Sequence, residues 1–207
     1  LDAHARCRND GKVFYKNALP NEIPQMSVGL LLDESGSMCS CDRCTYARSS
    51  AIILYDFCKA LHIPVTVYGH STSGSSVELY SYAEFESIDN DDKYRMMDIA
   101  ARGSNRDGAA LRFVAEQLVK RPEEVKILIL VSDGQPAAPG YYGSAAEEDL
   151  RGIKQEYRRK GVLFIAAAIG EDKQNIERIY GDSFMDITDL NQLPVKLTAA
   201  VKRHMRV

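Results

Sequence analysis

Residues 26–37 read MSVGLLLDESGS, and this stretch decides the fold class. Its first seven residues form a mostly apolar run, the pattern of a strand buried on both faces, and oxygen-bearing side chains follow at once. Two more apolar runs of this kind occur at 125–131 and 162–168. Strands buried on both faces belong to parallel sheets that helices cover on either side. The sequence therefore predicts an α/β protein.

Amphipathic stretches and shorter strands separate these runs. A helix is predicted at 43–61, where apolar residues recur every three or four positions. The other predicted helices are 92–100, 109–120, 145–159 (after a capping box of Ser144 and Glu147), 175–180 and 194–206, and the other predicted strands are 63–68, 77–82 and 183–187. Right-handed crossovers then give an open, doubly wound, mostly parallel sheet with one antiparallel edge strand, 77–82, and helices on both faces.

Composition limits the domain organisation and the class of protein. The chain has 207 residues, of which 45% are hydrophobic and 27% charged, as in one folded domain. We expect a lead-in segment at 1–24 and a single domain at 25–207. The net charge of -3 and the lack of a basic stripe argue against nucleic-acid binding. No apolar run approaches the roughly 20 residues that span a bilayer, so no membrane span is expected.

Two features of the sequence bear on where the protein works. The chain begins with Leu1, so we expect it to be part of a longer polypeptide. Its five cysteines are an odd number and do not form the framework of a secreted disulfide-rich protein. We therefore expect a reducing, cytoplasmic compartment.

Three polar loops follow the predicted strands or precede the next helix. We name them the first loop (residues 33–37, DESGS), the second loop (103–108, GSNRDG) and the third loop (132–136, SDGQP). In open α/β sheets, ligands bind beyond the carboxyl ends of the strands, where these loops should meet. Alternation of Asp and Ser in the first loop turns oxygens to one side of an extended chain. Such oxygens suit a hard cation such as Mg²⁺, and the absence of His and Cys from the loops argues against zinc.

The same motifs resemble a known family. They are similar to the von Willebrand factor type A (vWA) domain with its metal-ion-dependent adhesion site, over 26–207. Within that family they resemble the branch with the C-terminal domain of the nitric-oxide-reductase activation protein and the cobaltochelatase accessory subunit. The strings that carry this likeness are LLLDESGSM (30–38), IPVTVYGH (63–70), GSNRDGAALRFVAEQL (103–118), KILILVSDGQP (126–136) and DITDLNQLP (186–194).

The resemblance implies a metal site and partners. The implied ligands are Asp33, Ser35, Ser37, Asn105 and Asp133, with Asp107 as the alternative to Asn105, which replaces the family's threonine. It implies that Mg²⁺ or Mn²⁺ keeps an open position for an Asp or Glu carboxylate of a partner protein. It also implies a MoxR-type AAA+ ATPase as partner and a target metalloenzyme that the complex activates or matures. We expect no catalysis by the domain itself.

A hydrolase is one competing interpretation. Residues 69–74, GHSTSG, nearly reproduce the G-x-S-x-G elbow, with Ser71 as nucleophile and with Asp133 and His204 in hydrolase order. However, Ser73 stands where the elbow needs glycine, and the following segment alternates like a strand although the elbow precedes a helix. A polar hairpin loop at 69–74 is the favoured interpretation.

Two other interpretations remain open. Asp33, which follows the first strand, could be the phosphorylated residue of a phosphotransferase, although Ser35 replaces the second carboxylate expected there. The cysteine segment, residues 39–44, places Cys39, Cys41 and Cys44 beside the first loop. Its C-x-C-x₂-C spacing lacks the second half of a typical zinc site.

Overall fold

The computed structural model describes residues 25–86, 89–134, 136–168 and 173–187, together with residues 195 and 199. The expected lead-in segment and all but two residues of the expected closing helix lie outside this part of the chain. In chain order, the α-helices (α), 3₁₀ helices (η) and strands (β) are β1 (Met26–Asp33), η2 (Gly36–Cys39), α1 (Arg43–Ala60), β2 (Val65–Ser73), β3 (Ser76–Ala83), α2 (Asp92–Arg95), η3 (Met96–Asp98), α3 (Asp107–Val119), β4 (Val125–Ser132), β5 (Ala137–Ala138), β6 (Tyr141–Tyr142), α4 (Gly143–Arg159), β7 (Val162–Ala168), α5 (Lys173–Tyr180), η4 (Gly181–Ser183) and β8 (Phe184–Asp186).

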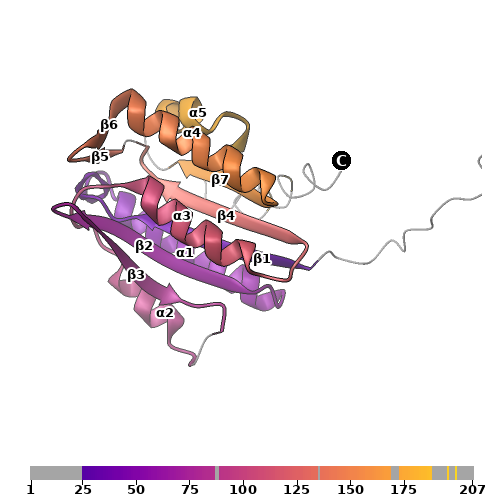
Figure 1. Cartoon of the computed structure of the whole chain (residues 1–207). Helices are drawn as coiled ribbons and strands as arrows, with labels where there is room; N and C mark the ends of the chain where they lie inside the picture. Colours follow the sequence, from indigo (N-terminus) through magenta and orange to yellow (C-terminus); the bar gives the residue numbers. More distant parts are fainter. Residues whose placement is uncertain are drawn as a thin grey trace, which may run out of the picture.

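The main sheet has the strand order β3-β2-β1-β4-β7-β8 (Figure 1). Neighbouring strands pair in parallel, except for β2 and β3, which pair antiparallel. Helix α1 covers one face of the sheet, and α3, α4 and α5 cover the other. The prediction of an open, mostly parallel sheet with one antiparallel edge strand and helices on both faces is confirmed.

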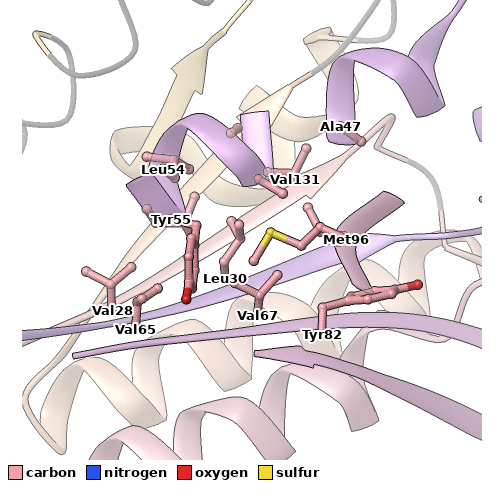
Figure 2. Close-up of a cluster of buried hydrophobic side chains, with 14 of the residues drawn as sticks. Val28, Leu30, Ala47, Leu54, Tyr55, Val65, Val67, Tyr82, Met96 and Val131 are labelled. Carbon is pink, nitrogen blue, oxygen red and sulfur yellow. The ribbon is translucent and has the colours of Figure 1, made fainter. Parts of the chain in front are cut away.

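The apolar run of β1 supplies both hydrophobic cores because alternate side chains of a strand point to opposite faces. Leu30 and Leu32 contribute to the core under α1, whereas Leu31 packs in the core under α3 and α4. Figure 2 shows the first core, where Leu30 lies close to Val67 and Met96. Burial on both faces explains why the run is continuous rather than alternating.

Strand β2 is longer than the sequence predicts. We expected a strand at 63–68 and a polar loop at 69–74, but β2 continues through most of the expected loop. The extension pairs with β3, with Thr72 opposite Val77. The antiparallel partner therefore supplies hydrogen bonds to the backbone N–H and C=O groups of these polar residues. The chain turns only at Gly74, whose φ of +62° is the left-handed conformation that glycine adopts readily.

The start of α4 also differs from the prediction. The helix begins at Gly143, ahead of Ser144, and no side-chain hydrogen bond caps it. The predicted capping box therefore does not form. A two-stranded hairpin of β5 and β6, which local periodicity did not indicate, lies directly before this helix and fixes where it begins. Among the described helices, none has the length and apolar character needed to cross a membrane.

Candidate functional site

The carboxylate of Asp33 joins all three loops. Asp33 ends β1, which lies between β2 and β4, and its side chain is fully buried. Its Oδ1 accepts a hydrogen bond from the backbone N–H of Ser35 at 2.8 Å. Its Oδ2 accepts from Asn105 Nδ2 at 2.9 Å and from Ser132 Oγ at 2.8 Å. Donors from the first, second and third loops therefore fix the orientation of this single carboxylate.

Asn105 acts as a bridge between loops. Besides its bond to Asp33, its Oδ1 accepts a hydrogen bond from the backbone N–H of Ala137 at 2.9 Å. A backbone N–H can only donate, so this contact identifies which end of the amide is the oxygen. The ligand role expected of Asn105 stays a prediction. A carbonyl oxygen that ligated a cation here would do so while also accepting from Ala137, using its second lone pair.

The hydroxyls of the first loop lie side by side. Ser35 Oγ is 2.9 Å from Ser37 Oγ; Ser35 is buried, whereas Ser37 is exposed. The loop is not extended as we expected, because η2 begins at Gly36 and Met38 N–H bonds back to the Ser35 carbonyl. The tight turn nevertheless presents both hydroxyls together. Gly36 N–H also donates to the Gly103 carbonyl at 2.6 Å, which ties the first loop to the second.

Asp133, in the third loop, lies against the start of α1. Its Oδ2 is 3.0 Å from Arg43 Nη1, and the same nitrogen is 3.4 Å from the Ser37 carbonyl oxygen. Arg43 thus connects the third loop to the first. Our sequence analysis did not identify Arg43 as part of the site. One feature of the sequence could have indicated it. Arg43 is at the first position of a helix, where the helix dipole disfavours a positive charge, so a compensating acidic partner could be expected.

Asp107, the alternative ligand, has a different neighbour. Its Oδ1 lies 3.2 Å from Nε2 of His70, and both side chains are buried. Burial lowers the pKa of His70, but the hydrogen bond and charge of Asp107, with smaller contributions from Asp33 and Glu34, outweigh it and raise the pKa above its usual value. As an acidic residue in the first turn of α3, Asp107 also complements the helix dipole.

Glu34 is a second buried carboxylate beside the site. Tyr82 OH donates to its Oε1 at 2.6 Å, and Arg102 Nε donates to its Oε2 at 2.7 Å. Burial and the bond to Glu34 raise the pKa of Tyr82. The backbone of Arg102 also donates to the Glu34 carbonyl at 2.6 Å. Our sequence analysis did not include Glu34 among the site residues. Its contacts fasten the first loop to the segment that leads into the second.

Ser71 holds the second loop rather than forming an elbow. It is fully buried within β2, where its Oγ accepts from Gly103 N–H at 2.8 Å and lies 3.3 Å from the Ser104 carbonyl. A hydrolase nucleophile needs a sharp strand-to-helix turn that exposes its hydroxyl, and this strand continues past Ser71. His204, the third residue of that interpretation, lies outside the described residues.

The cysteine segment flanks the site without forming a cluster of its own. Cys39 and Cys41 are exposed, and Cys44 is half-buried, with burial raising the pKa of its thiol. Among the residues that the structure describes, no three His, Cys, Asp or Glu side chains are grouped as metal ligands. The metal-binding potential of this edge therefore depends on carboxylates combined with hydroxyls, a set of hard oxygen donors that suits Mg²⁺ better than zinc.

Comparison with known proteins gives relatives in sequence, one over most of the chain and another over less than half of it. YojO of Bacillus subtilis (strain 168) is 25% identical over 206 residues, which cover 93% of this chain and 32% of YojO. Protein NorD of Brucella suis biovar 1 (strain 1330) is 34% identical over 97 residues, covering 45% of this chain and 15% of NorD. The chain thus spans about a third or less of these relatives.

Solved structures share the fold. A von Willebrand factor type A protein from Catenulispora acidiphila is 18% identical with a TM-score of 0.56, covering 82% of this chain and 40% of that one. The open pilus adhesin SpaC from Lactobacillus rhamnosus GG is 14% identical with a TM-score of 0.64, covering 88% of this chain and 30% of SpaC. The family model of the cobalamin biosynthesis protein CobT VWA domain matches residues 93–205, more than half of the chain. The chain therefore belongs to the CobT VWA-domain family and is a vWA domain of the NorD and CobT branch.

Proposed function

We propose that this vWA domain is a protein-interaction module whose binding depends on Mg²⁺ or Mn²⁺. The observation that supports it is the Asp33 carboxylate, held by donors from three loops at the carboxyl edge of the sheet, where ligands bind in this class of fold. The residues that would hold the ion are Asp33, Ser35, Ser37 and Asp133, with Asn105 or Asp107 from the second loop. A bound ion would supply a Lewis-acidic position for an Asp or Glu carboxylate of the partner.

The fixed parts of the site favour such a role. Asp33 has one orientation because Asn105, Ser132 and a backbone N–H hold it, so little ordering is left to occur on binding. Ser37 is exposed, so a partner carboxylate can approach the loop from solvent. Hydroxyl ligands are neutral, so the charge of the ion would be no more than balanced by the two carboxylates. A coordination position left open by this ligand set could then accept a partner carboxylate.

The cellular setting is part of the proposal. The matching family model is that of the CobT VWA domain, and NorD is a relative in sequence over 97 residues. We infer that the domain works in the cytoplasm with a MoxR-type AAA+ ATPase in activating or maturing a metalloenzyme, as in nitric-oxide-reductase activation, and that it performs no catalysis itself. The ATPase would supply the energy, and the vWA domain the metal-dependent contact.

Metal binding is tested by isothermal titration of the purified domain with Mn²⁺. Wild type should bind, and Ser37→Ala should bind at least about tenfold more weakly because it loses a ligand, a loss of about 1.4 kcal/mol. Ser37 is exposed, so this variant should fold normally. Asp56→Asn, on the exposed side of α1 beside Lys93, is the matched control and should bind like wild type. Equal affinities in all three proteins, or no binding by wild type, would refute the proposal.

Partner binding is tested separately with the full-length protein and a purified MoxR-type ATPase from the same organism. Binding should be strong in Mg²⁺, lost in a chelator and weakened by Ser37→Ala. If neither the chelator nor Ser37→Ala changes the affinity for the ATPase, the interface is independent of metal. Ser71→Ala should leave partner binding intact in the folded protein, because Ser71 supplies no ligand.

A further inference from the structure

Arg43 places a permanent positive charge within the candidate metal site. From the first position of α1, its Nη1 reaches Asp133 Oδ2 at 3.0 Å and lies 3.4 Å from the Ser37 carbonyl oxygen. The two side chains of the pair are only 13% and 5% exposed. Solvent and salt therefore screen this pair less than an ordinary surface ion pair. An arginine remains protonated at every physiological pH, so this charge cannot be titrated away.

We propose that Arg43 is an intramolecular competitor of the divalent cation for Asp133 and thereby sets the metal affinity of the site. The inference rests on the proposed function, because it assigns Asp133 to the ion. A carboxylate oxygen that already accepts from a guanidinium offers less electron density to a metal ion. Two positive centres near one carboxylate also repel each other, and this repulsion is stronger where water is excluded. The ion must therefore displace Arg43 or share Asp133 with it.

The local backbone gives an independent reason to assign Arg43 a tertiary role. The chain enters α1 through Cys41 and Asp42, whose φ angles of 54° and 56° are left-handed conformations that non-glycine residues adopt at a cost. Asp42 is the N-cap residue but makes no side-chain capping bond, and the first turn of α1 holds no acidic residue. No side-chain capping bond stabilises this helix start, and the positive charge of Arg43 at its first position is opposed by the helix dipole. The contact of Arg43 with Asp133 compensates for both.

Displacement of Arg43 would therefore act on more than the metal. The same contact stabilises a strained helix entry that contains the cysteine segment. Metal binding that takes Asp133 from Arg43 removes one support of this entry. Metal occupancy and the order of residues 41–46 are thus coupled, and the exposed face beside Ser37 changes when the ion binds.

The experiment is isothermal titration of Mn²⁺ into wild type, Arg43→Gln, Arg43→Lys and Arg48→Gln at one ionic strength. Arg43→Gln should bind about tenfold more tightly than wild type, equivalent to about 1.4 kcal/mol. Arg43→Lys keeps the charge without the planar fork and should fall between the two; it also serves if the Gln variant does not fold. Arg48 lies on the same helix but donates to the Ile99 carbonyl at 2.7 Å. Arg48→Gln, the control for loss of one charge, should change affinity less than about twofold.

Each outcome decides between the two proposals. Measurable binding by wild type together with tighter binding by Arg43→Gln, and by no charge-loss control, supports the inference. If wild type binds and Arg43→Gln binds equally or more weakly, the inference is overturned and the proposed function stands, because Arg43 then only orients Asp133. If neither protein binds Mn²⁺, both proposals fail.

Hydrogen exchange tests the coupling between metal binding and the helix entry. Backbone amides of residues 41–46 should exchange faster in wild type with saturating Mn²⁺ than without it. Unchanged exchange would overturn the coupling.

Discussion

Asn105 donates its side-chain amide to Asp33 across 2.9 Å, although 72 positions separate the two residues in the chain. Through its other end it accepts the backbone N–H of Ala137. One buried side chain therefore connects the end of β1 to β5 and sets how the Asp33 carboxylate is oriented. The resemblance implies that Asn105 is a metal ligand, which stays a prediction; the contacts that the structure shows orient Asp33 without an ion.

This role predicts a stability cost for Asn105→Ala. The substitution removes the side-chain acceptor of the Ala137 N–H and takes one donor from the fully buried Asp33 carboxylate, so the free energy of unfolding should fall by about 2–3 kcal/mol. Urea denaturation measures it. Asn175→Ala, at a partly exposed position in α5, is the matched control. It should lower the free energy of unfolding by less than about 0.5 kcal/mol, because alanine favours the helix and offsets part of any loss. Equal effects of the two substitutions would contradict a bridging role for Asn105.

Gly69 predicts a second stability effect. A Cβ built at this position would lie 1.7 Å from Glu34 Oε1 and 2.9 Å from the Tyr82 ring. Gly69→Ala must therefore push Glu34 out of its bonds to Tyr82 and Arg102, and we expect a loss of about 3 kcal/mol in thermal or urea unfolding. Gly152→Ala is the opposite control. It lies in α4 with nothing within 4 Å of the added carbon, so it should stabilise the protein by about 0.5–1 kcal/mol. If Gly69→Ala is as stable as wild type, the contacts of Glu34 with Tyr82 and Arg102 do not contribute the expected stability.

Ser71→Ala separates a structural role from a nucleophilic one. The variant loses the acceptor of the Gly103 N–H, so we expect a decrease of about 1–2 kcal/mol in the free energy of unfolding. Any ester hydrolysis measured with an activated ester should be the same in wild type and variant, because the hydroxyl is buried within β2. Activity in wild type that the substitution abolishes would restore the hydrolase interpretation.

The ion pair of Asp149 predicts a pH dependence. The hydrogen bonds that Asp149 accepts from Arg112, at 2.6 Å, and from the Tyr141 hydroxyl, at 2.8 Å, hold its pKa below the ordinary value of 3.8. A carboxyl whose pKa is lower in the folded state adds stability above its unfolded pKa and loses it as the pH falls through the folded pKa. Wild type should thus be about 1 kcal/mol more stable than Asp149→Asn at pH 7.

This difference should shrink as the pH falls below 3.8 and through the lower pKa of the folded state, because Asp149 then becomes protonated and position 149 is uncharged in both proteins. The comparison is made by measuring the melting temperatures of wild type and Asp149→Asn between pH 3 and 7, at intervals of about one pH unit. In the Arg112→Gln background, Asp149→Asn should produce a much smaller and flatter difference, because the main partner is gone. A difference that stays constant with pH would show that Asp149 contributes through neutral hydrogen bonds alone.

Local patterns in the sequence were enough to determine the architecture. Continuous apolar runs in β1, β4 and β7 required burial on both faces, which only a parallel sheet covered by helices provides. The order of strands and helices then placed the first, second and third loops at one edge of the sheet. Alternation of Asp33, Ser35 and Ser37 also anticipated the neighbouring hydroxyls, although the turn that brings them together is a 3₁₀ helix.

Tertiary structure alone decided which residues the loop side chains contact. Asn105 meets Asp33, Arg43 meets Asp133, and Glu34 is enclosed by Tyr82 and Arg102, all through contacts between distant parts of the chain. Tertiary structure also decided the length of β2. Its polar C-terminal residues favour a loop, but pairing with β3 holds them in the strand. Such contacts carry no periodic signal, because their energy comes from burial and hydrogen bonding after the sheet has formed. Local sequence therefore specified the frame, and packing at its edge specified the site.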